Sequence, residues 1–399
     1  MRSPPGQTAC RADLKYSLKE NSLVAKKYRL GVIGFAHMHV NELMRRFAEL
    51  DSVEWVACAD TIPKRPELVE ARSTRGWNLK QARERIGIPR VYDDYREMLE
   101  NERFDLVIFC PENSRHGDVA EAIAEHGAHM LTEKPMAASL SEALRMTRAA
   151  QAHNVELFVN WPSTWSTAVR KAKGLLEEGA IGDLWEVKWR GGSLGPLSHG
   201  SVHPGIDGTI VEISDTEKGA TWWHHGSTGG GALLDYCCYG ACLSRWYIGG
   251  PAVAAFGMKA NFSSLYGDAE DNAVITVRFP RAMAILEATW STVDHGVPNG
   301  PILYGNRGTM VVESAAGESV VKLIQGKGQE PTYISGDPLP AGRDTIAKEI
   351  IHHLETGEPV HPTLEAGFNL EAEAILDAGI RSAQSGKLEV VHNSAWCIG

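Results

Sequence analysis

Six short apolar runs between residues 28 and 160 alternate with segments of helical periodicity. The runs cover residues 28–33, 53–59, 91–92, 104–110, 128–131 and 156–160. Alternation of this kind predicts βαβ units, in which parallel strands are covered by helices on both faces of the sheet. We therefore expect an α/β, doubly wound domain over residues 28–160, with ligands bound beyond the carboxyl ends of its strands.

Length, charge and cysteine content limit the alternatives. A chain of 399 residues exceeds what one core usually holds, so a second domain is expected over residues 161–399. The net charge of −10, without a long basic run, argues against nucleic acid or an anionic membrane as a partner. Residues 1–27 are polar and lack a secretory signal, so we expect a flexible extension. Seven cysteines without a C-x-x-C pair favour a reducing compartment, by default the cytoplasm.

The turn after the first apolar run is a candidate cradle for the phosphates of a dinucleotide. It reads Gly34-Phe35-Ala36-His37, and Ala36 is small enough for a close backbone approach. Histidine at position 39 replaces the third glycine of the usual fingerprint. Asp60 ends the second run, where a carboxylate accepts hydrogen bonds from ribose hydroxyls. This arrangement favours NAD over NADP, although Lys64 and Arg65 nearby leave dual use open, and Asp60 could instead cap a turn.

A lysine lies where the fifth run ends. Thr132-Glu133-Lys134-Pro135 follows that run, so Lys134 is expected at the carboxyl edge of the sheet, pointing into a cleft. The alternative interpretation is a surface lysine in a strand-to-helix turn.

The second half of the chain has a different pattern. Strand-like runs with short turns are expected at residues 184–190, 253–260, 274–279, 283–290, 302–304, 309–313, 320–324 and 388–391. Ile275, Val277 and Phe279 alternate onto one face. Helices are expected at residues 164–178, 343–355 and 364–385, and the last can pack back on the first domain. Together these patterns predict an α+β domain with a mostly antiparallel sheet.

The segment from Gly229 to Gly240 carries the most reactive groups of this half. On a helix that starts near Gly231, Asp235 and Tyr239 are four residues apart and share one face. That face presents a carboxylate and a phenol. The alternative is that Tyr239 is a core aromatic residue beneath the sheet.

Four segments together resemble the glucose-fructose oxidoreductase, inositol dehydrogenase and rhizopine-catabolism (Gfo/Idh/MocA) family. They are Gly31-Val32-Ile33-Gly34, Asp60, the stretch from Cys110 to His116, and Glu133-Lys134-Pro135. The resemblance implies a Rossmann domain followed by a domain with a large, open, mostly antiparallel sheet. The segment from Gly229 resembles the branch with D-x-x-x-Y in place of D-x-x-x-H.

The resemblance also implies roles for individual residues. Lys134, Asp235 and Tyr239 would form the catalytic group. Residues expected at the cofactor are Gly34, Phe35, Ala36, His37, Asp60, Cys110, Pro111, Asn113, His116, Glu133, Lys134, Asn160 and Trp161. Residues expected at the substrate are Lys134, Trp161, His224, His225, Asp235 and Tyr239.

The chemistry implied is transfer of hydride between the nicotinamide and a carbinol carbon, with loss of the hydroxyl proton. Tyr239, or a water, could take that proton if Lys134 and the nicotinamide lower the tyrosine pKa from about 10. Lys134 could equally be the base, because neighbouring cations depress the pKa of a lysine. Asp235 would orient the substrate through an adjacent hydroxyl.

The substrate is expected to be a sugar, glycoside or polyol. The long segment 191–227 is rich in glycine, histidine and aromatic residues, which can stack on sugar rings and exchange hydrogen bonds with hydroxyls. Only His199 and His203 have a ligand-like spacing and no third ligand is evident, so no metal is expected. The family resemblance implies a homo-oligomer, a dimer or tetramer, joined through the open sheet.

Three functions fit these features. The first is an NAD-dependent sugar or polyol dehydrogenase with an exchangeable cofactor. The second is a redox-neutral enzyme with tightly bound NAD(H), either a sugar–sugar oxidoreductase or an NAD-dependent glycoside-cleaving enzyme. The third is a non-catalytic regulator that binds dinucleotide, which the presence of Lys134, Asp235 and Tyr239 argues against.

Overall fold

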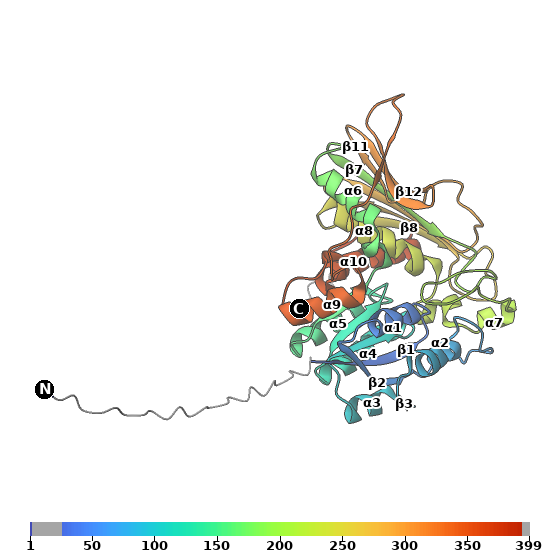
Figure 1. Cartoon of the computed structure of the whole chain (residues 1–399). Coiled ribbons are helices and arrows are strands. Elements are labelled where there is room, and N and C mark those ends of the chain that lie inside the picture. Colours follow the sequence, from blue (N-terminus) through green and yellow to red (C-terminus); the bar gives the residue numbers. More distant parts are fainter. Residues whose placement is uncertain (2–25, 393–399) are drawn as a thin grey trace.

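The structure, a computed structural model, describes Met1 and residues 26–392. The extension expected over residues 1–27 therefore lies almost wholly outside the described residues. In the described part, two sheets lie one above the other, with helices of the C-terminal region between them (Figure 1). None of the described helices is both long enough and apolar enough to cross a bilayer.

The first sheet has six strands in the order β3-β2-β1-β4-β5-β6, and all its pairings are parallel. Its strands are β1 (Tyr28–Phe35), β2 (Val53–Ala59), β3 (Val91–Tyr92), β4 (Leu106–Cys110), β5 (His129–Glu133) and β6 (Leu157–Asn160). The helices between them are α1 (Val40–Ala48), α2 (Arg75–Gln81), α3 (Tyr95–Asn101), α4 (His116–Glu125) and α5 (Leu140–Ala152). This order confirms the doubly wound Rossmann arrangement. The order reverses between β1 and β4, so the turns after those two strands flank the cleft.

One helix is shorter than the charge pattern suggests. The charge pattern predicts a helix over residues 67–86, but α2 begins only at Arg75, after the extended N-cap Thr74. Pro63 and Pro66 interrupt the preceding segment, because proline cannot donate its backbone N–H to a helix. The Glu67 carboxylate instead accepts a hydrogen bond of 2.8 Å from the backbone N–H of Arg75.

The second sheet has nine strands, in the order β14-β13-β12-β11-β7-β10-β9-β8-β15, and it is antiparallel except where β7 pairs with β10. Its strands are β7 (Leu184–Gly192), β8 (Ala254–Ala260), β9 (Asn272–Arg278), β10 (Met283–Thr289), β11 (Ile302–Gly305), β12 (Thr309–Ala315), β13 (Glu318–Ile324), β14 (Thr332–Ser335) and β15 (Glu389–Val390). Ile275, Val277 and Phe279 are buried on one face, as their alternation predicts.

Helices from the second half cover the buried face of this sheet. They include α6 (Thr167–Glu177), a π-helical turn (Leu233–Cys237), α8 (Cys238–Ile248) and α10 (Ala366–Ser385). Helix α10 contacts β8 on one side and α5 and β6 of the first sheet on the other. The last long helix therefore packs back on the first sheet, as the sequence suggests.

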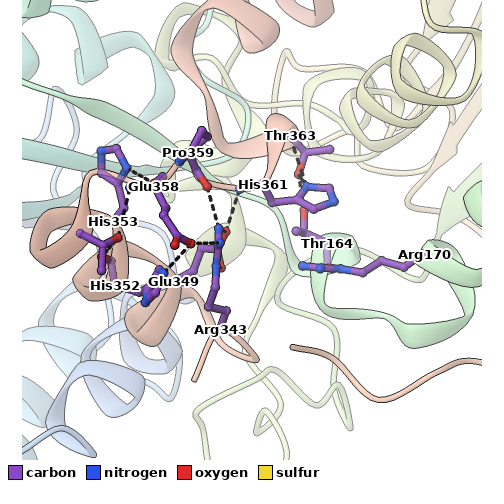
Figure 2. A network of polar contacts seen from close by, with 11 residues as sticks. Thr164, Arg170, Arg343, Glu349, His352, His353, Glu358, Pro359, His361 and Thr363 are labelled. Atoms are coloured by element: carbon purple, nitrogen blue, oxygen red, sulfur yellow. Dashed lines mark hydrogen bonds and ion pairs between the residues drawn. The ribbon is translucent and has the colours of Figure 1, made fainter. Parts of the chain in front are cut away.

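The chain also returns to the first sheet through α9 (Ile346–Thr356). Ile346 and Ile350 of this helix share a buried cluster with Leu30 and Phe47 of β1 and α1. A polar network surrounds the helix (Figure 2), in which the Arg343 guanidinium bonds to the Glu349 carboxylate at 2.7 and 2.8 Å. These contacts fix the C-terminal segment against the edge of the cleft.

Candidate active site

The centre of the candidate site is an ion pair between the two halves of the chain. Lys134 follows β5, is 2 % exposed, and donates from Nζ to Asp235 Oδ1 at 2.7 Å. The same Nζ donates to the backbone carbonyl of Asp235 at 2.9 Å. Trp290, just beyond β10, donates from Nε1 to the second carboxylate oxygen, Oδ2, at 3.0 Å. Lys134 is therefore directed into the cleft and paired, and is not a surface lysine.

Asp235 lies in an irregular part of its helix. Residues Leu233–Cys237 form a π-helical turn before α8 begins. Single π-helical turns are rare and recur at functional sites. Besides Lys134, the Asp235 carbonyl accepts a hydrogen bond from Cys238 Sγ at 3.2 Å. A regular helix starting near Gly231 was the expectation, so the widened turn that presents this carbonyl is a feature that only the structure shows.

Tyr239 completes the expected trio, with its ring held among other aromatic residues. It stacks on Trp189 with ring centroids 5.5 Å apart, and it meets the edge of Trp161 at 5.6 Å. Lys134 Nζ lies over the same ring, 4.8 Å from its centroid, which is a cation–π contact. The structure therefore brings Lys134, Asp235 and Tyr239 together.

The ionisation of these groups bears on which of them is the base. Burial is the largest single influence and lowers the pKa of Lys134, but Asp235 together with Tyr239, Cys238 and Glu133 outweighs it, so the pKa is raised well above its ordinary 10.5. Burial also raises the pKa of Tyr239, although Lys134 acts in the opposite direction. Without a bound cofactor both groups therefore hold their protons at neutral pH. Tyr239 therefore does not have the lowered pKa that would make it a base.

Glu133 lies next to Lys134 and faces a different set of partners. Its carboxylate is fully buried, with Oε1 2.9 Å from His39 Nδ1 and Oε2 accepting a hydrogen bond of 2.7 Å from Asn160. His37 is buried close by, and its Nδ1 is 3.2 Å from the backbone N–H of His39. The β1–α1 turn and the end of β5 therefore form a cluster of two imidazoles and a carboxylate.

The turn after β1 has the conformation that a dinucleotide cradle requires. Gly34 has φ +81°, and a Cβ added there would lie 2.6 Å from the backbone nitrogen of Pro111. Only glycine fits this left-handed, crowded position. Cys110 is buried, and its carbonyl accepts a hydrogen bond of 3.1 Å from the backbone N–H of His37. The turns after β1 and β4 thus pack directly against each other.

Asp60 lies at the other end of this groove, where the adenosine ribose is expected. Its Oδ1 accepts from the backbone N–H of Phe35 at 3.0 Å and of Thr61 at 2.8 Å, and from Arg75 at 2.6 Å. Arg75 also contacts Glu112 at 2.5 Å. Burial raises the pKa of Asp60 despite the adjacent guanidinium. Asp60 is thus a half-buried, ion-paired carboxylate that does more than cap a turn.

Buried polar atoms without partners line the groove between these two ends. Within the described residues, no hydrogen-bond partner is present for Asn113 Oδ1, Ser114 Oγ or His116 Nε2. Buried polar atoms are normally satisfied, so such atoms indicate a missing ligand. Together with Gly34 and Asp60 they fit a dinucleotide. The His116 ring is oriented through Nδ1, which lies 3.0 Å from the Met136 carbonyl.

A long irregular loop from the second half covers this groove; we call residues 193–230 the cover loop. Trp222 donates from Nε1 to the Ala36 carbonyl at 2.9 Å. The Gly229 carbonyl accepts from Asn113 at 2.8 Å, and the Ser227 carbonyl accepts from Lys64 at 3.1 Å. The loop is therefore bonded to the turn after β1, the segment after β2 and the turn after β4, which are the three walls of the groove.

Some residues expected at the substrate have other neighbours in the structure. His224 is buried against the rings of Tyr266 and Trp290, and burial lowers its pKa to about 3. His225 is buried with Nε2 2.6 Å from the Gly219 carbonyl. Their contacts anchor the cover loop, and their assignment to the substrate stays a prediction.

Trp161, expected at both cofactor and substrate, lies behind Tyr239. Its Nε1 donates to Asn369 of α10 at 2.7 Å. Sequence reasoning missed three contacts: Trp290 with Asp235, Trp189 with Tyr239, and His39 with Glu133. The spacing of His37 and His39 was visible as a signal, but the two tryptophans reach the site only through the pairing of β7 with β10.

Comparison with known proteins identifies the family. The model of the oxidoreductase family with an NAD-binding Rossmann fold matches residues 28–161, and that of the GFO/IDH/MocA C-terminal domain matches residues 169–311. Myo-inositol 2-dehydrogenase of Thermotoga maritima is 23 % identical over 70 % of this chain and 78 % of its own. D-xylose 1-dehydrogenase [NADP(+)] of Haloarcula marismortui is 28 % identical over 45 % of this chain and 46 % of its own.

A solved structure shows the same fold. Aldose-aldose oxidoreductase from Caulobacter crescentus, complexed with glycerol, superposes with a TM-score of 0.71 over 92 % of this chain and all of its own, at 20 % identity. The two family models together cover well over half of the chain. The chain is therefore a member of the Gfo/Idh/MocA oxidoreductase family, with an NAD-binding Rossmann domain.

Proposed function

We propose that this protein transfers hydride between NAD and a hydroxyl-bearing carbon of a sugar, glycoside or polyol. The observation that carries the proposal is the buried Lys134–Asp235 pair of 2.7 Å at the carboxyl end of β5. An ammonium and a carboxylate that meet at this edge can bind adjacent hydroxyls of one substrate. The two relatives are named as dehydrogenases of inositol and xylose, both polyhydroxylated, which supports the same substrate class.

Different residues around the groove would bind different parts of NAD. Asp60 would accept hydrogen bonds from the adenosine ribose, the turn at Gly34 would face the pyrophosphate, and Asn113 and His116 would face the nicotinamide half. Bound NAD supplies the hydride acceptor. The protein contributes position, exclusion of water and proton transfer.

Because Lys134 is charged, its role differs between the reducing and the oxidising direction of hydride transfer. In the reducing direction the ammonium is ready to donate a proton to the oxygen of the forming alcohol. In the oxidising direction Lys134 must first lose its proton, and a nearby nicotinamide cation would promote this by lowering the lysine pKa. Asp235, held by Lys134 and Trp290, would accept a hydrogen bond from the neighbouring hydroxyl.

The cover loop favours the redox-neutral alternative as a second candidate. Its bonds to Ala36, Lys64 and Asn113 lie across all three walls of the groove, so NAD can enter or leave only if the loop moves. A slow exchange of this kind suits an enzyme that reoxidises its cofactor with a second substrate. Tight binding of NAD(H) would be the signature of this alternative.

One experiment tests the function and separates the candidates. Freshly purified protein is denatured, and any released dinucleotide is identified by mass and absorbance. Native protein is then screened with aldoses, inositols and glycosides while NADH absorbance is recorded. Empty protein that reduces added NAD indicates a dehydrogenase. Stoichiometric NAD(H) without net reduction indicates the redox-neutral enzyme. Protein that binds dinucleotide but turns over no sugar, singly or in donor–acceptor pairs, contradicts the proposal.

We also propose that the protein works as a homo-oligomer, a dimer or tetramer, in a reducing compartment such as the cytoplasm. Trp185, Met258 and Tyr333 on strands of the second sheet are exposed, which supports self-association through that sheet. The cysteines described as free are Cys58, Cys110, Cys237, Cys238 and Cys242, all buried. Light scattering after size exclusion should give a mass of at least two chains, and a monomer at micromolar concentration would contradict this assembly.

A further inference from the structure

The cluster beside the catalytic lysine has the composition of a metal site. One ligand atom each of His37, His39 and Glu133 lies within 4.8 Å of the other two. Two imidazoles and one carboxylate form a donor set that zinc enzymes use when a fourth position is left open for water or substrate. Among the histidines of the long loop only His199 and His203 have a ligand-like spacing, so no metal was expected from the sequence.

The distances fit an ion that draws the side chains slightly together. Donor atoms about 2.0 Å from a tetrahedral ion are about 3.3 Å from each other. His39 Nδ1 and Glu133 Oε1, at 2.9 Å, are already near this separation. Among the described contacts His37 has no bond to Glu133, so we expect its ring to turn toward the ion.

Glu133 is a buried carboxylate that a bound cation would stabilise. Its carboxylate is fully buried, and its two hydrogen bonds are to an imidazole and to the Asn160 amide. The neighbouring ammonium of Lys134 is already paired with Asp235 at 2.7 Å. Burying a carboxylate is costly unless it is paired, and a divalent ion between Glu133 and the imidazoles would pair it.

His37 provides an independent indication of a missing ligand. The side chain is 2 % exposed, and within the described residues its Nε2 has no hydrogen-bond partner. Trp223 packs on the ring edge-on, with centroids 4.8 Å apart. The Nε2 nitrogen becomes a ligand only if the proton moves to Nδ1, so His37 must give up the hydrogen bond that Nδ1 accepts from the His39 N–H.

The surroundings supply support and access. Asn160 fixes the Glu133 carboxylate through Oε2 and leaves Oε1 facing His39, which is the outer-shell arrangement that orients metal ligands. A cavity of about 200 Å³ is lined by His39 and Asn160 together with residues of α1, the 3-10 turn after β6 and the start of α9. This cavity gives an ion a route to the cluster.

We propose that His37, His39 and Glu133 bind a divalent transition-metal ion, with zinc the best match to the donor set, beside Lys134. The ion leaves an open position for a hydroxyl group. This site goes beyond the proposed function, and only its use by a sugar substrate rests on that function. Such a use would help to explain how a hydroxyl loses its proton when Lys134 and Tyr239 both hold theirs, because a cation lowers the pKa of an oxygen bound to it.

The test is a metal titration without dinucleotide or sugar. Protein stripped with a chelator is titrated with Zn²⁺ against a chromophoric competitor, and the bound metal is measured by mass spectrometry. We expect one equivalent per chain and a raised melting temperature. Co²⁺ in place of Zn²⁺ should give visible d–d absorption when His37, His39 and Glu133 coordinate it. Histidines with only a structural role would not bind Co²⁺ and would give no such spectrum.

Substitutions of single side chains test which residues coordinate the metal. His39→Asn and Glu133→Gln should abolish the Co²⁺ spectrum, and Asn160→Ala should weaken Zn²⁺ binding by about 10- to 100-fold. His199→Asn, in an exposed histidine outside the cluster, is the matched control and should bind like the wild type. Melting curves in chelator distinguish a misfolded variant from one that has lost only its metal.

Substoichiometric binding, or equal binding by wild type and His39→Asn, would overturn the site. Because the titration contains neither NAD nor sugar, a failed metal site leaves the proposed function standing. A protein that binds zinc but reduces no NAD fails only the function.

Discussion

The two ends of the cleft each bury a carboxylate against a cation, but the balance of forces differs between them. At the catalytic end, pairing outweighs burial and the pKa of Lys134 is raised well above its usual value. At the adenosine end, burial outweighs pairing and the pKa of Asp60 is raised although Arg75 lies 2.6 Å away. The first pair is thus favourable in its charged form. In the second pair burial raises the pKa of Asp60, while, against burial, Asp60 and Glu112 together raise the pKa of Arg75, so the cost falls on the carboxylate.

The largest expected effect comes from breaking the catalytic pair. Lys134→Ala should lower kcat by about 10²- to 10⁴-fold, the range for loss of a proton-transfer group. It should also lower the melting temperature, because Asp235 is left partly buried without its cation. Steady-state kinetics and thermal unfolding measure the two effects. Lys80→Ala, at an exposed lysine, is the control, and a kcat within threefold of wild type would remove Lys134 from the catalytic group.

The opposite end should respond differently to loss of its charge. Asp60→Asn keeps the shape and the acceptor oxygen but removes the buried charge. We expect NAD binding to weaken about 10- to 100-fold, from the loss of charge-assisted hydrogen bonds, while the melting temperature stays equal or rises. Calorimetric titration with NAD and thermal unfolding give both values. A melting temperature that falls as far as that of Lys134→Ala would show that the two ends do not differ.

A smaller effect on kcat is expected from loss of the hydrogen bond between Trp290 and Asp235. Trp290→Phe keeps the ring but removes the N–H that bonds Asp235 Oδ2 at 3.0 Å. One such bond to a charged group is worth about 1.5 kcal/mol, so kcat should fall about tenfold. NAD affinity should not change, because Trp290 contacts the substrate side of the cleft. Equal losses in kcat and in NAD affinity would indicate general disorder of the site and contradict a positioning role.

The smallest effect is the pH dependence of the catalytic pair. Because the folded pKa of Lys134 is raised, its contribution to stability is fully present below the unfolded value of about 10.4 and is lost as pH rises through the folded value. The difference in melting temperature between wild type and Lys134→Met should therefore be constant from about pH 6 to 9 and shrink only above about pH 10. A difference that already shrinks near neutrality would mean that Lys134 is not held as an ammonium.

Much of the fold, and the meeting of Lys134, Asp235 and Tyr239, follows from local pattern. Short apolar runs that alternate with helices specify a parallel sheet, and the end of a buried strand places Lys134 at the cleft. The four-residue spacing brings Asp235 and Tyr239 to the same face. These inferences succeed because each depends on a few neighbouring residues and on the fixed periods of strands and helices.

The partners of those residues could not be read in the same way. Trp290 meets Asp235, and Trp189 meets Tyr239, across strand pairings that the sequence does not specify. The cover loop has no period at all, so its route over Ala36 and Asn113 emerges only from the packed structure. Similarly, α2 begins eight residues later than the charge pattern suggests, and the Glu67 carboxylate bonds to the backbone N–H of Arg75 at its first turn.

The sequence by itself determined which reactive groups reach the cleft: Lys134 after its strand, Asp60 after another, and Asp235 with Tyr239 on one helical segment. Tertiary structure alone decided their protonation, since a pKa depends on burial and on charges that arrive from distant parts of the chain. It also decided that His37 and His39 meet Glu133, about a hundred residues further along the chain. A motif determines which strand or helix carries a side chain. The protonation state of that side chain depends on neighbours that only the folded structure brings close.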